Sequence, residues 1–233
     1  MPDRSLLVDE LSRFARTLVT DYPVSDALHD LVESTTAILG IHGAGTSIAR
    51  AGTLTFVTAA PEDIAAIEEV QERHQVGPCI DVYRSGEPVC VADVTAERDR
   101  YPALAAAASS RGIVAIAAVP LQLNAARLGA LDLYDTRPHE WTEEEIHTAG
   151  LLASMATGYI ANASQLDQAR QTAEQLQEAL DSRVIIEQAK GVIAGERGIT
   201  VDQAFQVLRA HARRNSAPLR DVANAVVHLG LRP

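Results

Sequence analysis

The stretch that decides the fold of the first half of the chain is GIVAIAAVPLQLNAARLGALDLY, residues 112–134. It consists of two apolar runs, Gly112 to Leu123 and Arg127 to Tyr134, around the short break Asn124-Ala125-Ala126. Two apolar runs separated by so few residues are typical of a hairpin, and a hairpin joins antiparallel neighbours. The stretch therefore predicts an antiparallel pair of strands.

More short strands are expected upstream of this hairpin. Gly45 to Arg50 and Leu54 to Ala59 contain several β-branched residues and flank Ala51-Gly52-Thr53, which predicts another hairpin. Val89 to Ala92 follows the turn residues Gly86-Glu87-Pro88 and predicts one more strand. About five short strands interrupted by helices favour an α+β fold with an antiparallel sheet.

Helical spacing of apolar residues surrounds these strands. It runs from about Ser5 to Thr20, from Ser25 to Leu39 and from Pro61 to His74. For the second of these helices we expect Ser25 to be the N-cap and Gly40 to follow the C-terminus.

From Thr142 onward the chain is expected to be helical. Thr142 is a candidate N-cap, and three glutamates follow it where the helix dipole favours acids. A heptad pattern then predicts a long coiled-coil helix that pairs with a second copy, with Asn162 fixing the register. The alternative is a single helix that lies on the N-terminal domain. The two seam positions read Leu152, Tyr159, Leu166, Ala173, Leu180 and Met155, Asn162, Ala169, Leu176, Arg183.

Two shorter helices are expected after this long one. Thr200 and Gln203 are spaced for a capping box at the start of the first. Ser216 is expected to cap the last helix, with Pro218 in its first turn and Gly230 after its end. Each helix has one apolar face, so together they predict a three-helix bundle of about 50 residues, close to the lower size limit for independent folding.

Composition restricts the class of protein. The chain has 47% hydrophobic and 22% charged residues, no apolar run of the roughly 20 residues that a membrane span needs, and no signal-peptide pattern. With Cys79 and Cys90 as the only cysteines, a cytoplasmic location is expected. The net charge is −11, but residues 181–233 carry eight basic and five acidic side chains, a balance of +3 that permits a polyanionic partner.

No pattern points to a catalytic residue, a cofactor or a metal site. Phosphate-loop, Gly-x-Ser-x-Gly and His-Glu-x-x-His motifs are missing from the sequence. His74, Cys79 and Cys90 are too few for the usual four-ligand zinc site, so we expect none. Cys79 follows a Gly-Pro turn and is either a small core residue or a redox or ligand contact.

The first half resembles a GAF domain, a small-molecule sensor module, from about Leu28 to Ile160. The resemblance implies an antiparallel sheet with helices on both sides and a pocket on one face, where Cys79, Asp93 and Tyr101 are candidate contacts for an unknown ligand. The signature of cyclic-nucleotide-binding members is missing, and no haem or bilin attachment is assignable. The matching motifs are Gln75-Val76-Gly77-Pro78-Cys79, Gly86-Glu87-Pro88-Val89, Val91-Ala92-Asp93-Val94, Arg100-Tyr101-Pro102, Gly112-Ile113-Val114-Ala115, Val119-Pro120-Leu121 and Leu128-Gly129-Ala130-Leu131-Asp132-Leu133-Tyr134.

The tail, from about Leu176 to Leu229, resembles the ANTAR family. Members are transcription antiterminators that bind tandem RNA stem-loops as dimers, so the resemblance implies an RNA stem-loop partner and a homodimer. We expect a sensor domain over 1–160, a helical connector over 161–175 and an RNA-binding domain over 176–233. The matching residues are Leu180, Arg183, Ile185-Ile186-Glu187-Gln188-Ala189-Lys190-Gly191-Val192-Ile193, Ala204-Phe205, Leu208-Arg209, Asn215, Leu219 and Val222-Ala223.

The residues of the tail are compatible with binding RNA. Lys190, the only lysine in the chain, lies beside Gly191, where a missing side chain allows close approach of a backbone. Arg209 and Arg213 share one helix face and are placed to bracket phosphates. The predicted RNA-binding residues are Arg183, Gln188, Lys190, Gly191, Arg209, Arg213, Arg214 and Asn215.

Three other functions stay open at this point. A DNA-binding helical regulator would need base-reading side chains early in its recognition helix, but the last helix begins Ala217-Pro218-Leu219. A redox enzyme resembling the GAF-fold methionine sulfoxide reductases would use Cys79 and Cys90. The bundle could also serve only to dimerise the protein.

Overall fold

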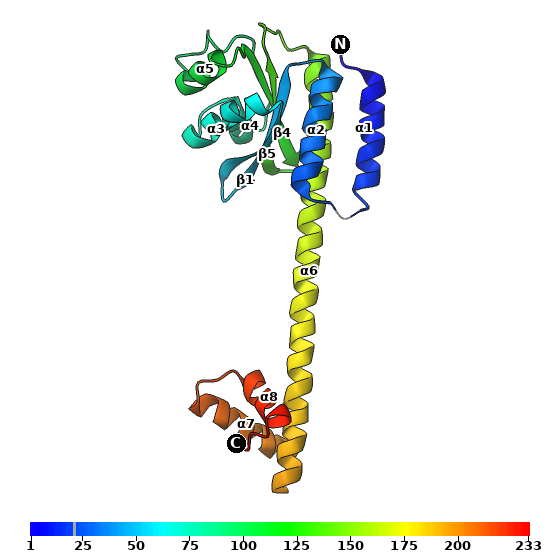
Figure 1. The fold of residues 1–233 in the computed structure, drawn as a ribbon, viewed down its shortest axis with the longest axis vertical. Coiled ribbons are helices and arrows are strands. Elements are labelled where there is room, and N and C mark those ends of the chain that lie inside the picture. The colour runs from blue at the N-terminus through cyan, green and yellow to red at the C-terminus, as the bar shows by residue number, and fades with distance from the viewer. Residues whose placement is uncertain (21) are drawn as a thin grey trace. The chain divides into compact units, whose positions relative to one another are not determined.

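The computed structural model describes residues 1–20 and 22–233, and the chain separates into two compact units, Met1–Ser164 and Gln165–Pro233 (Figure 1). The first unit contains α1 (Arg4–Thr17), α2 (Val24–Leu39), β1 (Gly43–Arg50), β2 (Thr53–Ala60), η1 (Glu62–Ile64), α3 (Ala65–His74), α4 (Pro78–Ser85), β3 (Val89–Val91), α5 (Pro102–Ser109), β4 (Ala115–Leu123), β5 (Ala126–Asp135) and the beginning of α6 (Glu143–Arg197). The second unit contains the rest of α6, α7 (Val201–Arg214) and α8 (Leu219–His228).

The first unit is built around a five-stranded antiparallel sheet in the order β2-β1-β5-β4-β3. The predicted hairpin is its centre, since β5 pairs with β4 on one side and with β1 on the other. The predicted α+β fold is confirmed. The eight-residue helices α4 and α5, which begin at Pro78 and Pro102, were not expected from the sequence.

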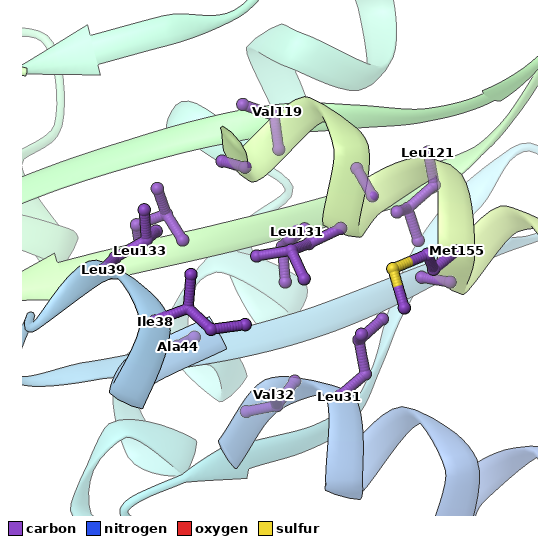
Figure 2. Close-up of a cluster of buried hydrophobic side chains, with 14 of the residues drawn as sticks. Leu31, Val32, Ile38, Leu39, Ala44, Val119, Leu121, Leu131, Leu133 and Met155 are labelled. Atoms are coloured by element: carbon purple, nitrogen blue, oxygen red, sulfur yellow. The ribbon is translucent and has the colours of Figure 1, made fainter. Parts of the chain in front are cut away.

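Side chains of β5 alternate between two apolar layers. Leu131 and Leu133 face α2 and the first turns of α6, where Leu31 and Met155 complete a buried cluster (Figure 2). Burial of one such side chain contributes about 1.5–3 kcal/mol. The opposite face of the sheet is covered by α3, α4 and α5. Asp132, one residue along the strand from these leucines, therefore belongs to the opposite face.

Predicted helix ends are confirmed where a local capping interaction causes them. Thr142 and Glu145 exchange a capping box, with the Glu145 carboxylate 2.8 Å from the Thr142 backbone nitrogen. Gly40 ends α2 with a left-handed backbone at φ 64°. The prediction for Ser25 was wrong, because the extended backbone of Pro23 starts α2 earlier and leaves Ser25 inside its first turn.

The predicted heptad seam divides into two parts. Leu152, Met155 and Tyr159 are buried in the first unit, so this part serves its own core. Asn162 donates to the Leu18 carbonyl oxygen at 3.1 Å and to the Tyr22 hydroxyl at 3.2 Å. Its side chain therefore has intramolecular partners, in place of the register-fixing role expected between two chains. The later leucines of the seam, Leu166, Leu176 and Leu180, are exposed.

The second unit is the predicted three-helix bundle. The capping box of Thr200 and Gln203 starts α7 as expected. Ser216 does not cap α8: its backbone is left-handed at φ 50°, and Pro218 is the N-cap residue. Each helix contributes three buried residues to the core, namely Ile185, Ala189 and Ile193, then Ala204, Leu208 and Ala212, then Val222, Ala223 and Val226. Among the described residues, no helix is both long and apolar enough to cross a membrane.

His139 lies between two carboxylates at the start of α6. Its Nδ1 is 2.9 Å from the Asp135 carboxylate and its Nε2 is 3.1 Å from that of Glu145, while its ring stacks on Trp141 at 4.2 Å. Burial by itself lowers the pKa of His139, but the hydrogen bonds to the two carboxylates outweigh it, and the net shift is upward from 6.5. The charged imidazolium is therefore the form that the fold stabilises.

The His139 contacts should make the stability of the first unit depend on pH. A raised pKa stabilises the fold fully below pH 6.5, and this contribution disappears as the pH rises through the folded-state pKa. We expect His139→Gln to lower the free energy of unfolding by about 1.5 kcal/mol at acidic pH and by clearly less at about pH 9. Denaturant unfolding followed by the fluorescence of Trp141, the only tryptophan, measures this difference.

The control is His147→Gln on the same helix. His147 is exposed, so its replacement should have a small effect at both pH values. An equal loss of stability at both pH values in His139→Gln would contradict the prediction.

Candidate functional site

The arginines predicted to bind RNA are exposed and carry free charges. Arg183 lies on α6, and Arg209, Arg213 and Arg214 lie on α7. Within the described part of the chain, none of these four side chains makes a hydrogen bond or an ion pair. Arg220 and Arg232 of this unit differ, since they are held by Glu178 at 2.8 Å and by Glu196 at 2.6 Å. The four free guanidinium groups are thus available to an external anion.

A basic stripe follows one face of α7. Phe205, Arg209 and Arg213 are spaced by four residues, so their side chains lie in line along the helix. The Lys190 ammonium lies 5.5 Å from the centre of the Phe205 ring, which places α6 beside the start of the stripe. Three of the predicted residues are brought to one surface in this way.

Lys190 itself is not a free cation. Its Nζ is 2.8 and 2.9 Å from the two carboxylate oxygens of Glu187, and its side chain is only 14% exposed. The contact to Phe205 joins α6 to α7, while the ion pair lies within α6 and holds the Lys190 ammonium in place. The lysine that the sequence singled out therefore has a structural role in the bundle.

The other predicted RNA contacts differ in how accessible they are to a partner. Gln188 is exposed on α6, and the space around Gly191 is open, since a Cβ there would meet no atom within 4 Å. Asn215 ends α7 and donates its amide to the His211 carbonyl oxygen at 2.9 Å. Its Oδ1 and second N–H stay open to a partner.

Sequence reasoning missed Arg197 as a site residue. It ends α6 and, with Arg214, lines a surface hollow of about 510 Å³. Two basic residues thus line a concave surface of the size that a phosphate group can enter. The only sequence signal was a basic side chain at a helix end, and this does not say which other side chains lie nearby. The other residues that line the hollow are Gln206, Val207, Ala210 and Pro233.

The three residues of the first unit that were predicted to contact a ligand each have different neighbours. Asp93 accepts hydrogen bonds from the backbone N–H and the hydroxyl of Thr95, at 2.8 and 2.6 Å. The Tyr101 hydroxyl donates to the Asp81 carboxylate at 2.6 Å, and burial followed by this hydrogen bond raises its pKa. Cys79 is buried on α4. No contact between these three side chains brings them into one pocket within the described residues.

Cys79 belongs instead to a buried polar cluster on the α3–α4 face of the sheet. The Tyr134 hydroxyl donates to the Glu68 carboxylate at 2.8 Å and accepts from the Gln71 amide at 3.1 Å. Asp132 lies beside Glu68 and is likewise completely buried. Burial raises the pKa of Glu68 to about 7, and burial followed by the Glu68 charge raises that of Asp132. The sequence did not indicate this cluster.

Comparison with known proteins identifies two domains in the chain. Residues 23–160 match the family model of the GAF domain, and residues 174–227 match that of the ANTAR domain. These matches confirm both resemblances. A search of curated proteins finds no match.

Solved structures share the fold of the first unit. A GAF domain of phosphoenolpyruvate-protein phosphotransferase from Acinetobacter is 13% identical, with a TM-score of 0.54 over 68% of this chain and 94% of its own. Free methionine-R-sulfoxide reductase from Neisseria meningitidis is 18% identical, with a TM-score of 0.53 over 71% of this chain and 95% of its own. A GAF domain/HD domain protein from Geobacter sulfurreducens is 14% identical, with a TM-score of 0.52 over 63% and 96%. At these identities the likeness concerns the fold alone.

Substitution of Lys190 should weaken the bundle, whereas substitution of a free arginine should not. Lys190→Ala removes an ion pair within α6 and a cation–π contact to α7, together worth about 1 kcal/mol. Arg213→Ala, which removes no contact, should change stability by less than about 0.5 kcal/mol. Amide hydrogen exchange along α7, measured by mass spectrometry on the full chain, reports this difference. Equal protection of α7 in both variants would contradict the assignment of a structural role to Lys190.

Proposed function

The chain belongs to the GAF domain family and carries an ANTAR domain at its C-terminal end, and from this premise we propose that it is a signal-responsive RNA-binding transcription antiterminator. The observation that carries the proposal is the set of free arginines on the bundle that the ANTAR model matches. Unpaired cations on a small fold are the usual means of binding a phosphate backbone. In this proposal the GAF half senses a small molecule or dimerises the protein, and the bundle binds stem-loops in nascent RNA.

RNA is favoured over duplex DNA by the side chains at the start of α8. A recognition helix reads bases with its first residues. Here those residues are Leu219 and Arg220, and Leu219 packs against the bundle core while Arg220 is paired with Glu178. Folded RNA is recognised mainly through shape and phosphates, which the stripe of Arg209 and Arg213 suits.

A redox enzyme is the less favoured alternative. Thiol chemistry needs an accessible thiolate, whereas Cys79 is buried and burial, followed by the nearby carboxylates, raises the pKa of its thiol. Cys90 is exposed, and partial burial of its thiol raises the pKa of that group as well. We therefore propose a regulator without catalytic residues or an organic cofactor. Because both cysteines are free, we also propose a cytoplasmic location.

The proposed homodimer would use the exposed part of the heptad seam. Leu166, Ala169, Ala173, Leu176 and Leu180 recur at spacings of three and four, so they form one apolar face of α6. Two bundles on one dimer would raise the effective concentration for a tandem stem-loop target.

The domain limits stay proposals. We keep a sensor over 1–160, a connector over 161–175 and an RNA-binding domain over 176–233. In this division the apolar face of α6 lies mostly in the connector. The ligand contacts Cys79, Asp93 and Tyr101, and the RNA contacts Arg183, Gln188, Lys190, Gly191, Arg209, Arg213, Arg214 and Asn215, are proposals as well.

The arginine stripe should dominate binding to RNA. We expect Arg209→Ala and Arg213→Ala each to weaken binding of a stem-loop RNA and to reduce the slope of log affinity against log salt by about 1. Fluorescence anisotropy with full-length protein at several salt concentrations measures both effects.

The matched control is Arg220→Ala, which makes the same change in net charge but removes a guanidinium group already neutralised by Glu178. Its salt slope should stay that of the unsubstituted protein. The proposal fails if the three variants behave alike, or if duplex DNA of equal length binds as tightly as the stem-loop.

Charges placed on the apolar face of α6 should separate the dimer. We expect Leu176→Asp combined with Leu180→Asp to give a monomer in light scattering, because two carboxylates would be buried against their counterparts. Affinity for a tandem stem-loop should then fall at least about tenfold, toward that for a single stem-loop. Leu229→Asp, which changes an exposed leucine outside this face, should leave both properties unchanged. A dimer that persists in the double variant would place the interface elsewhere.

A further inference from the structure

Three side chains with metal-binding groups meet inside the GAF half. Glu68 comes from α3, Cys79 from α4 and Asp132 from β5, and one ligand atom of each lies within 4.8 Å of the other two. Among the described residues they are the one group of three such side chains. All three are buried. Segments far apart in the sequence thus bring a thiol and two carboxyl groups to one point in the core.

The carboxylate of Asp132 has the least compensated charge in this cluster. Both of its carboxylate oxygens are inaccessible to solvent, and within the described residues no group donates a hydrogen bond to them unless the neighbouring Glu68 carboxyl is protonated. Its neighbour Glu68 cannot donate to it while both are ionised, and the two negative charges repel. A buried carboxylate of this kind costs several kcal/mol unless a cation or a proton compensates it. The buried oxygens of Asp132 therefore require either a proton shared with Glu68 or a bound cation.

The other two ligands are held in place by a chain of hydrogen bonds. The Cys79 backbone nitrogen donates to the Gln71 side-chain oxygen at 3.3 Å, and the Gln71 amide donates to the Tyr134 hydroxyl at 3.1 Å. That hydroxyl donates to one Glu68 oxygen at 2.8 Å, while the Ser47 hydroxyl lies 3.4 Å from the other. Supporting bonds of this type orient metal ligands.

The backbone of β1 packs closely against the cluster. Gly45 of β1 lies directly against the Glu68 carboxylate, where even a Cβ would overlap with it. Zinc holds its ligand atoms about 2.0–2.3 Å from the ion. Ligand atoms that are at most 4.8 Å apart need to close by only about an ångström to reach this geometry.

We propose that Glu68, Cys79 and Asp132 bind one divalent transition-metal ion of the zinc class. A thiolate with two carboxylates matches the ligand preferences of zinc and disfavours magnesium or calcium, which take oxygen ligands only. Binding displaces the thiol proton of Cys79 and any proton shared by the two carboxyl groups, and these protons pass to solvent. No change of oxidation state is involved. The site goes beyond the proposed function, and its test uses no RNA.

The test measures metal bound by the full-length protein after refolding with zinc or cobalt(II) and removal of the excess. One ion per chain is expected by elemental analysis, and cobalt should give a thiolate-to-metal charge-transfer band in the near ultraviolet. Cys79→Ser should lose that band, and Asp132→Asn should bind zinc at least about 100-fold more weakly in chelator competition. Because Asp132→Asn also relieves the repulsion by Glu68, its metal-free form should unfold at no lower temperature than the unsubstituted protein.

Cys90→Ser is the matched control, since Cys90 is exposed on β3 and outside the cluster, and it should bind metal normally. Protein that retains no metal and shows no cobalt band would mean that a shared proton alone compensates the carboxyl pair, and the proposal would be overturned. Retention of the band in Cys79→Ser, or its loss in Cys90→Ser, would also overturn it. Either result leaves the RNA-binding proposal untouched, because the two sites share no residue.

Discussion

The structure depends first on the burial of the first turns of α6 against the central strands of the sheet. Leu152 and Met155 are enclosed there with Leu131 and Leu133 of β5. Without this contact one face of the sheet would be exposed, and α6 would begin without support. The helix does not end at the sheet: its later turns contribute Ile185 and two further residues to the core of the bundle. One continuous helix therefore supplies apolar side chains to both cores.

Charged side chains without an opposite charge nearby occur in both units, but they are exposed in one unit and buried in the other. On the bundle, guanidinium groups such as Arg209 and Arg213 are unpaired but fully hydrated, so they cost the fold little and stay available to a polyanion. In the core of the GAF half, the carboxyl groups of Glu68 and Asp132 are dry and lie beside each other, which is costly unless a proton or a cation is present. Hydration explains why the fold tolerates the exposed arginines without a ligand. The buried carboxyl groups require compensation inside the protein.

Sequence reasoning succeeded where a local interaction decides the outcome and failed where more distant packing does. The turn at Asn124, the cap at Thr142 and the capping box at Thr200 depend on residues within a few positions, and all three were predicted correctly. Ser216 resembles a cap in sequence, but the chain adopts a left-handed backbone there before α8 begins. Helices α4 and α5 were missed because eight residues contain too few apolar repeats to show a helical period.

The sequence by itself determined the α+β sheet, the terminal three-helix bundle and the two family resemblances, because periodicity, turn residues and local motifs are properties of neighbouring residues. It also placed Arg209 and Arg213 on one face of a helix, since residues four apart share a face. Only the tertiary structure decided that Lys190 is held by Glu187 and Phe205, and that Glu68, Cys79 and Asp132 converge. These contacts depend on which helix faces which strand and on small differences in packing. No short-range pattern encodes that choice.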